Sequence, residues 1–144
     1  MIPYVRSPAE GAGFVLQAAP QRLLQFSSDN QCMSVICRVF RELPGGGFTE
    51  PRSLIYCKGS PEKMRFICRP ETVPGDYAEI LDRYASQGFR IIGVASRHIP
   101  ANMDKTAKIN KLTRAEIESD LTFLGLIILE NRIKPVSAQV FKVA

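Results

Sequence analysis

Residues 53–62 read SLIYCKGSPE, and this stretch predicts a strand that passes through a short turn into a helix. The apolar run over 53–57 is typical of a buried strand. Ser60 can cap a helix, and Pro61 suits the first helical position because no backbone donor is lost there. This strand–turn–helix unit is the fixed point around which the rest of the chain can be interpreted.

The turn itself, Lys58 followed by Gly59, has the chemistry of an anion site. Lysine supplies a flexible cation, and glycine lets a ligand approach the backbone. The amides at the start of the following helix favour negative charge. The residues taken alone nevertheless favour a structural role, since any strand-to-helix turn needs a glycine and a cap.

Further elements are expected on both sides of this unit. Residues 33–40 (MSVICRVF) predict a buried strand, joined to the strand at 53–57 by the glycine-rich loop 41–47. Asp76 can cap a helix that ends at Gly88. The apolar stripe of that helix consists of Tyr77, Ile80, Leu81 and Tyr84. The remaining expectations are strands over 14–18, 89–95 and 121–129 (the last one buried), a polar and partly helical segment over 99–112, and a capping box at Thr113 and Glu116.

This order of elements predicts α/β content (α+β): a mostly antiparallel twisted sheet with helices packed on it. The chain has 144 residues, 45% hydrophobic and 23% charged, which fits a single domain over 1–144 with its own core. Residues 1–11 are expected to be an irregular lead-in. No apolar run approaches the ~18 residues of a membrane helix, and residues 1–6 lack the apolar region of a signal peptide.

Charge and cysteine usage narrow the function classes. The net charge of +5 attracts polyanions, although the scattered lysines and arginines favour a solvated surface over a dedicated patch. The four cysteines are Cys32, Cys37, Cys57 and Cys68, and no two form a C-x-x-C pair. With His98 as the only histidine, the sequence predicts no metal site, no Ser-His-Asp or Cys-His site, and four free thiols of a cytosolic protein.

Familiar phosphate-binding loops are absent, since neither G-x-x-x-x-G-K-[ST] nor G-x-G-x-x-G occurs. The stretch KGSPE at 58–62, however, resembles the K-G-A-P-E motif of the nucleotide-binding domain of P-type ATPases. Residues 26–35 (FSSDNQCMSV) resemble that family's F-S-S-x-x-x-x-M-S-V segment. Residues 88–96 (GFRIIGVAS) and 121–135 (LTFLGLIILENRIKP) resemble two later blocks in the same order. The last block is similar to the segment that returns to the phosphorylation domain, so residues 130–144 are expected to be a return segment.

The resemblance implies that the chain binds ATP, with Mg²⁺ only as the counter-ion of ATP and no catalytic residue of its own. Phe26 matches the family's adenine-stacking phenylalanine, and Lys58 and Arg90 match residues that line the pocket and contact the nucleotide. The full set of expected binding residues is Phe26, Met33, Ser34, Lys58, Gly59 and Arg90. Glu10 is a candidate for the acidic contact to the adenine amino group, and Cys32 stands where the family often has a basic residue.

Two further features refine the resemblance. ENRIKP at 130–135 and PETVP at 70–74 resemble the B branch of the fifth class of P-type ATPases, which transports polyamines from late endosomes and lysosomes. This implies a cytosolic, monomeric domain cut from a membrane pump, with phosphorylation, actuator and membrane domains as its partners. The stretch DKTAK at Asp104 looks like the family's phosphorylation motif, but it lacks the glycine and follows a polar loop, so we expect no phosphorylation there.

Two other functions stay open on the residues alone. One is a small basic nucleic-acid-binding domain, which salt-dependent oligonucleotide binding would reveal. The other is an interaction domain without a working nucleotide pocket. Without the resemblance, Phe26 is better interpreted as a core phenylalanine and Arg90 as a solvated arginine at a strand end.

Overall fold

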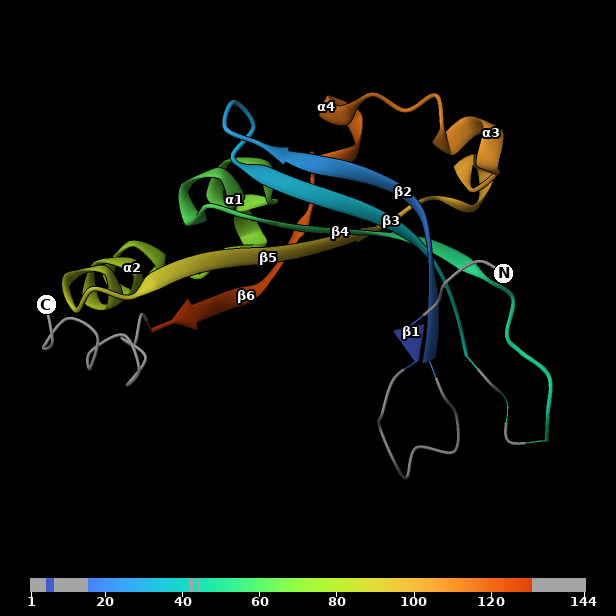
Figure 1. Cartoon of the computed structure of the whole chain (residues 1–144), viewed down its shortest axis with the longest axis horizontal. Helices are drawn as coiled ribbons and strands as arrows, with labels where there is room; N and C mark the ends of the chain where they lie inside the picture. Colours follow the sequence, from blue (N-terminus) through green and yellow to red (C-terminus); the bar gives the residue numbers. More distant parts are fainter. Residues whose placement is uncertain (1–4, 7–15, 42, 44, 131–144) are drawn as a thin grey trace, which may run out of the picture.

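The computed structural model describes residues 5–6, 16–41, 43 and 45–130, which form one sheet with helices on it (Figure 1). Six strands lie in chain order, and every neighbouring pair is antiparallel. They are β1 (Val5–Arg6), β2 (Leu16–Ser27), β3 (Cys32–Arg41), β4 (Arg52–Gly59), β5 (Arg90–His98) and β6 (Thr122–Leu129). The prediction of an antiparallel sheet with helices packed on it is confirmed.

The helices are short. They are α1 (Pro61–Ile67), α2 (Tyr77–Ser86), α3 (Thr106–Ile109) and α4 (Arg114–Ile117), with single 3₁₀ turns η1 (Pro70–Thr72) and η2 (Ala101–Met103). None of the helices in the described part of the chain has the length and apolar character needed to cross a membrane.

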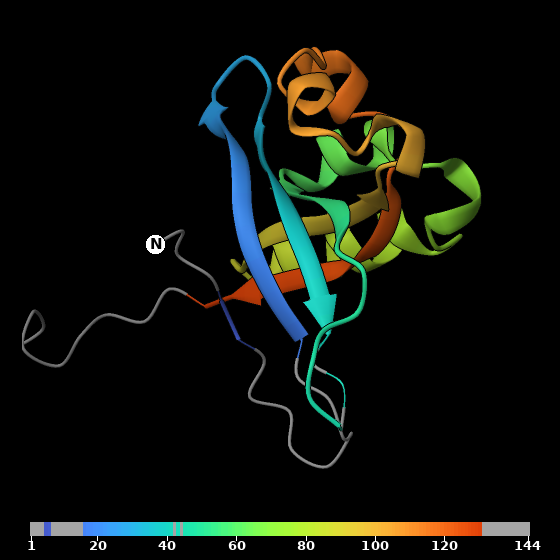
Figure 2. The ribbon, with the colours of Figure 1, turned by 90° about the vertical axis from the view of Figure 1, so that its right-hand side faces the viewer.

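The two faces of the sheet differ in what covers them. One cross-strand row faces the helices and consists of Leu24, Ser34, Cys57, Ala95 and Phe123. The helix residues Met64, Ile67, Ile109 and Ile117 belong to the same hydrophobic core as this row. The adjacent row, one residue along each strand, points to the other face because side chains alternate in a strand. Figure 2 shows helices gathered on one side of the sheet.

The strand–turn–helix unit at 53–62 folds as its sequence predicts. The Ser60 hydroxyl accepts a hydrogen bond from the Lys63 amide at 3.2 Å and caps α1, with Pro61 at the first position. The turn also contacts the β2–β3 hairpin, since the Ser60 amide donates to the Gln31 carbonyl at 3.0 Å. The hairpin turn and the β4–α1 turn therefore lie side by side.

Other caps agree in position and differ in detail. Thr113 and Glu116 form both halves of the predicted capping box at the start of α4. Asp76 does stand at the N-cap of α2, but its side chain makes no capping hydrogen bond. The predicted stripe of α2 includes the buried Tyr77, and Gly88 follows the helix with a φ of 83°.

The extent of the first long strand differs from the expectation. A short strand was expected over 14–18, whereas β2 continues to Ser27. Pro20 lies within β2 although proline cannot donate a backbone hydrogen bond to a ladder. Among the described residues, β1 pairs only with Gln17 and Ala18, so Pro20 lies where β2 is an edge strand and a missing donor is tolerated.

The burial of the last strand also differs from the expectation. Residues 121–129 were expected to form a buried strand, but β6 pairs only with β5 and is an edge of the described sheet. Leu124, Ile127 and Leu129 are exposed. An apolar run alone does not distinguish a central strand from an edge strand.

The described residues share one hydrophobic core, and the extent of the domain over 1–144 stays a prediction. Most of the lead-in over 1–11, the candidate Glu10 and residues 131–144 of the return segment lie outside the described residues.

Candidate functional site

The sheet face opposite the core carries two of the predicted residues in one cross-strand row. Met33 of β3 pairs with Lys58 of β4, and Lys58 pairs with Val94 of β5. Neighbouring strands lie ~4.8 Å apart, so the lysine stands between two apolar side chains. Lys58 is exposed, while Met33 and Val94 are half-buried. Met33 and Val94 thus form an apolar floor on both sides of the Lys58 cation. This arrangement suits a ligand that combines an aromatic ring with an anionic group.

Phe26 lies beside this row, at the end of β2. Leu24 pairs with Ser34 and Ser27 pairs with Cys32, so Gln25 and Phe26 together oppose one residue of β3 in a β-bulge. A bulge redirects side chains out of the regular alternation. Phe26 is 63% exposed, which excludes the alternative of a core phenylalanine.

Arg90 is the first residue of β5, four positions before Val94. Even spacing places the two on the same face, about 13 Å apart along an extended strand. Arg90 is exposed, and neither it nor Lys58 forms a side-chain hydrogen bond or ion pair within the part of the chain that the structure describes. Both cations are therefore available to a ligand on this face.

A second row extends the same face. It consists of Leu23, Val35, Tyr56 and Ser96. Sequence reasoning did not single out Val35 or Tyr56. Their spacing of two from Met33 and Lys58 was the signal that could have found them, because it predicts a shared face. We call these two rows, together with Phe26 and Arg90, the open face.

Ser34 does not reach the open face. It belongs to the row that points toward the helices, it is 1% exposed, and its hydroxyl donates to the Glu118 carboxylate at 2.7 Å. The alternation of β3 separates it from Met33, its neighbour in the sequence. The structure therefore brings Met33, and not Ser34, to Lys58.

Gly59 has a structural explanation. A Cβ added there would lie 2.5 Å from the Cβ of Cys32 and 2.5 Å from the Gln31 carbonyl oxygen. Only a glycine lets β4 pass this close to the end of the β2–β3 hairpin. The side of Gly59 that lacks a side chain is thus filled by the start of β3.

A buried polar cluster lies beneath the open face, on the helix side of the sheet. The ligand atoms of Cys32, Cys57 and Glu118 all lie within 4.8 Å of one another. Burial raises the pKa of both thiols, that of Cys57 to about 12, so both are protonated at neutral pH. Burial opposes ionisation of Glu118, but hydrogen bonds from Arg114 and Ser34 hold the pKa of its carboxyl below the ordinary value. The carboxylate is already paired with Arg114 at 2.9 Å, so we interpret the cluster as a structural network.

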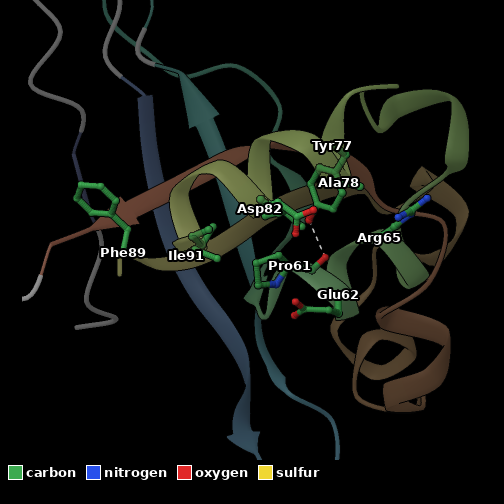
Figure 3. Close-up of a pocket in the computed structure, with 10 residues that line it drawn as sticks. Pro61, Glu62, Arg65, Tyr77, Ala78, Asp82, Phe89 and Ile91 are labelled. Carbon is green, nitrogen blue, oxygen red and sulfur yellow. Dashed lines mark hydrogen bonds between the residues drawn. The ribbon is translucent and has the colours of Figure 1, made fainter. Parts of the chain in front are cut away.

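A groove of about 550 Å³ lies between α1 and α2, and none of the predicted binding residues lines it (Figure 3). Glu62, Arg65 and Asp82 line it together with apolar side chains. The Tyr77 hydroxyl bridges the two helices by donating to the Pro61 carbonyl at 2.6 Å. The mixture of two carboxylates and one guanidinium does not favour an anionic ligand.

Asp104 is held by the sheet. Its carboxylate accepts a hydrogen bond from the hydroxyl of Ser53, the second residue of β4. This contact gives the aspartate of the DKTAK stretch a structural role at the end of the sheet.

Comparison with known proteins identifies relatives of the chain. Residues 17–136 match the family described as P-type ATPase, cytoplasmic domain N. The chain is 43% identical over 115 residues to the cation-transporting ATPase catp-5 of Caenorhabditis elegans, an alignment that covers 80% of this chain and 9% of that protein. It is 38% identical over 117 residues to the polyamine-transporting ATPase 13A2 of Homo sapiens, covering 81% of this chain and 9% of that protein.

A third relative is the probable cation-transporting ATPase 13A5 of Mus musculus, 39% identical over 121 residues, or 84% of this chain and 9% of the relative. The chain thus spans only 9% of the length of each of these curated relatives. The family match covers most of the chain and includes every residue of the open face. The chain belongs to the family of P-type ATPase cytoplasmic N domains.

Proposed function

We propose that the open face binds ATP. The observation that carries this proposal is the arrangement of Phe26, Lys58 and Arg90. A bulged, exposed aromatic ring lies beside a lysine in an apolar floor, and an exposed arginine lies farther along the same face. Membership of the N-domain family supports the same function.

The chemistry of the three side chains suits different parts of the nucleotide. The exposed Phe26 ring offers adenine a stacking surface, worth about 1–3 kcal/mol per base in nucleic-acid systems. The Lys58 stem can pack along the base while its ammonium attracts phosphate oxygens. Arg90 is about 13 Å along β5 from the Lys58 row, a separation suited to the phosphate end of an extended nucleotide.

We propose further that the chain holds ATP for transfer of its γ-phosphate to an aspartate on another domain of a cation pump. The polyamine-transporting relative supports a polyamine or related cation as cargo. A late-endosomal or lysosomal membrane as the location rests on the resemblance of residues 70–74 and 130–135 to the polyamine branch. In the whole pump, the phosphorylation, actuator and membrane domains are the expected partners.

Magnesium is expected to arrive as the counter-ion of ATP. Among the described residues, the cluster whose atoms could hold a metal is buried on the helix side, and its carboxylate is paired with Arg114. The open face itself contributes cations to the nucleotide. Binding to the isolated chain should therefore depend little on added magnesium.

On this proposal the isolated chain binds ATP weakly and does not hydrolyse it. One stacked base and two exposed cations correspond to a Kd of roughly 0.1–5 mM once ligand ordering is subtracted. Isothermal calorimetry that gave a submicromolar Kd would contradict the proposed set of contacts. Phosphate release well above buffer that Asp104→Asn abolished would contradict binding without turnover.

The experiment that tests the site compares two phenylalanines. Phe26→Ala should weaken ATP and AMP by a similar factor, about tenfold for ~1.4 kcal/mol. Phe66→Ala is the matched control, because Phe66 on α1 is 86% exposed and lies on the helix side. Circular dichroism confirms that both variants fold. A folded Phe26→Ala that binds ATP like the unmodified chain would exclude Phe26 from the site.

A further inference from the structure

Arg114, the first residue of α4, forms hydrogen bonds to both strands of the β2–β3 hairpin. Its Nη1 donates to the Gln25 carbonyl at 2.9 Å, and its Nη2 donates to the Cys32 carbonyl at 2.7 Å. Gln25 shares the β-bulge with Phe26, and Cys32 is the first residue of β3. The guanidinium therefore connects the two strands at the place where Phe26 leaves the regular ladder.

The Arg114 guanidinium is itself fixed by a buried carboxylate on the same helix side, that of Glu118. Its Nε donates to Glu118 Oε2 at 2.9 Å, and the side chain of Glu118 is only 4% exposed. Ser34 donates to the other carboxylate oxygen of Glu118 at 2.7 Å. Because the guanidinium is planar and all its donors are fixed in direction, these contacts define the position of the fork that faces the hairpin.

The β2–β3 hairpin has two irregular features that hydrogen bonds from outside the hairpin can stabilise. Gln31, the last residue before β3, has a φ of 54°, a left-handed value that is unusual for a residue other than glycine. The bulge on the other strand interrupts the regular pairing between Leu24 and Ser27. Without Arg114, the Gln25 carbonyl would lose its hydrogen bond to the guanidinium, and the bulge would be free to rearrange.

We propose that Arg114 is a positioning residue for the nucleotide site: it fixes the bulge from the helix side and so sets the direction of the Phe26 ring on the open face. This inference rests on the proposed function. Arg114 acts through Phe26 and does not touch the nucleotide, since its partner Glu118 is held by Ser34 on the helix side.

The test uses Arg114→Lys, which keeps a positive charge beside Glu118 but cannot reach both carbonyls in the planar geometry of a guanidinium. Arg97→Lys is the matched control. Arg97 also donates to α4, to the Glu116 carbonyl at 2.7 Å, and its hydrogen bonds do not involve the hairpin bulge. Each change is made alone and in the Phe26→Ala background, and ATP and adenosine are titrated by NMR.

Arg114→Lys is expected to weaken ATP and adenosine equally, by roughly three- to tenfold, because the affected contact is to the base. The effect should vanish in the Phe26→Ala background, where no ring remains to be positioned. Arg97→Lys should leave both affinities unchanged. A purely structural role for Arg114 would give the same loss with and without Phe26, and that result would overturn the inference, as would a folded Arg114→Lys with unchanged affinity.

A second variant covers the case in which Arg114→Lys does not fold. If Arg114→Lys does not fold, Thr113→Ala replaces it, since this change removes the side-chain cap of α4 and leaves Arg114 in place. It should weaken binding in the same Phe26-dependent way but less, and a loss independent of Phe26 would overturn the inference.

If the unmodified chain binds no ATP, the proposed function fails, while hydrogen exchange at the Gln25 and Phe26 amides still tests the tie between α4 and the bulge. Exchange there should accelerate in Arg114→Lys and not in Arg97→Lys. Equal exchange in both variants would overturn the inference.

Discussion

At the scale of single residues, the proposed function assigns recognition of the base and recognition of charge to different side chains of the open face. Phe26 offers an aromatic ring, whereas Arg90 offers only a guanidinium at the exposed start of β5. On the same proposal Lys58 combines the two roles, because it pairs with the apolar Met33 and Val94 and its stem can pack along the base. The three substitutions should therefore have different ligand profiles.

Arg90→Ala should weaken ATP several-fold and leave adenosine almost unchanged, because the contribution of an exposed arginine depends on phosphate charge. Raising the salt concentration should shrink the difference, since exposed charges are screened within about 10 Å at 0.1 M salt. Arg83→Ala on the exposed side of α2 is the control. Titrations with both ligands at two salt concentrations check this, and an equal loss for adenosine and ATP would argue against a phosphate contact.

The residue scale also shows how far sequence reasoning reaches. The resemblance selected Met33 and Lys58, which the register of β3 and β4 places side by side. It did not separate Met33 from Ser34, although adjacent positions in a strand point to opposite faces. The exposure of Phe26 was not predictable from the local pattern, because it depends on a bulge that forms against β3.

At the scale of elements, close approach between β4 and the β2–β3 hairpin limits what the sequence can contain. Gly59→Ala places a Cβ 2.5 Å from Cys32 Cβ and from the Gln31 carbonyl oxygen, and backbone must move to relieve this overlap. Gly93 on β5 faces a softer neighbour, since an added Cβ would lie 2.4 Å from Cγ of the Met64 side chain. A flexible methionine side chain yields more easily than backbone.

Gly59→Ala should therefore destabilise the fold by about 1–3 kcal/mol, and Gly93→Ala by less. Gly75→Ala is the control, because no atom lies within 4 Å of the position of its added Cβ. Urea unfolding followed by circular dichroism measures all three. A Gly59→Ala variant as stable as Gly75→Ala would contradict the packing of β4 against the hairpin.

Elements were more predictable from the sequence where local chemistry determines them. The Ser60 cap with Pro61, and the Thr113–Glu116 capping box, depend on neighbouring residues and were found. The length of β2 and the edge position of β6 depend on which strands pair with them, and both were missed. Strand pairing involves residues far apart in the chain, and the local pattern of apolar residues does not reveal it.

At the scale of the whole molecule, the fold holds all four cysteines in buried positions. Burial raises the pKa of Cys57 to about 12 and of Cys68 to about 11, from an ordinary value of 9.0. The folded state therefore favours the protonated thiols. The stability that they contribute is fully present below pH 9.0 and is lost as pH rises toward about 12.

These thiols should react with a disulfide reagent only after unfolding. At pH 8 the folded chain should show almost no labelling, because reaction requires an accessible thiolate, and denaturant should release all four thiols. Absorbance of the released reagent, with and without denaturant, gives the counts. A cysteine that labels rapidly in the folded chain would contradict the buried core.

The central claim is that the open face, and not the groove between α1 and α2, receives ATP. The most direct measurement is a titration of the ¹⁵N-labelled chain with ATP, followed by amide chemical shifts. We expect the largest changes at Phe26, Met33, Lys58 and Arg90, with small changes around the groove. Changes centred on the groove, or no saturable change at up to about 10 mM ATP, well above the expected Kd, would contradict the claim.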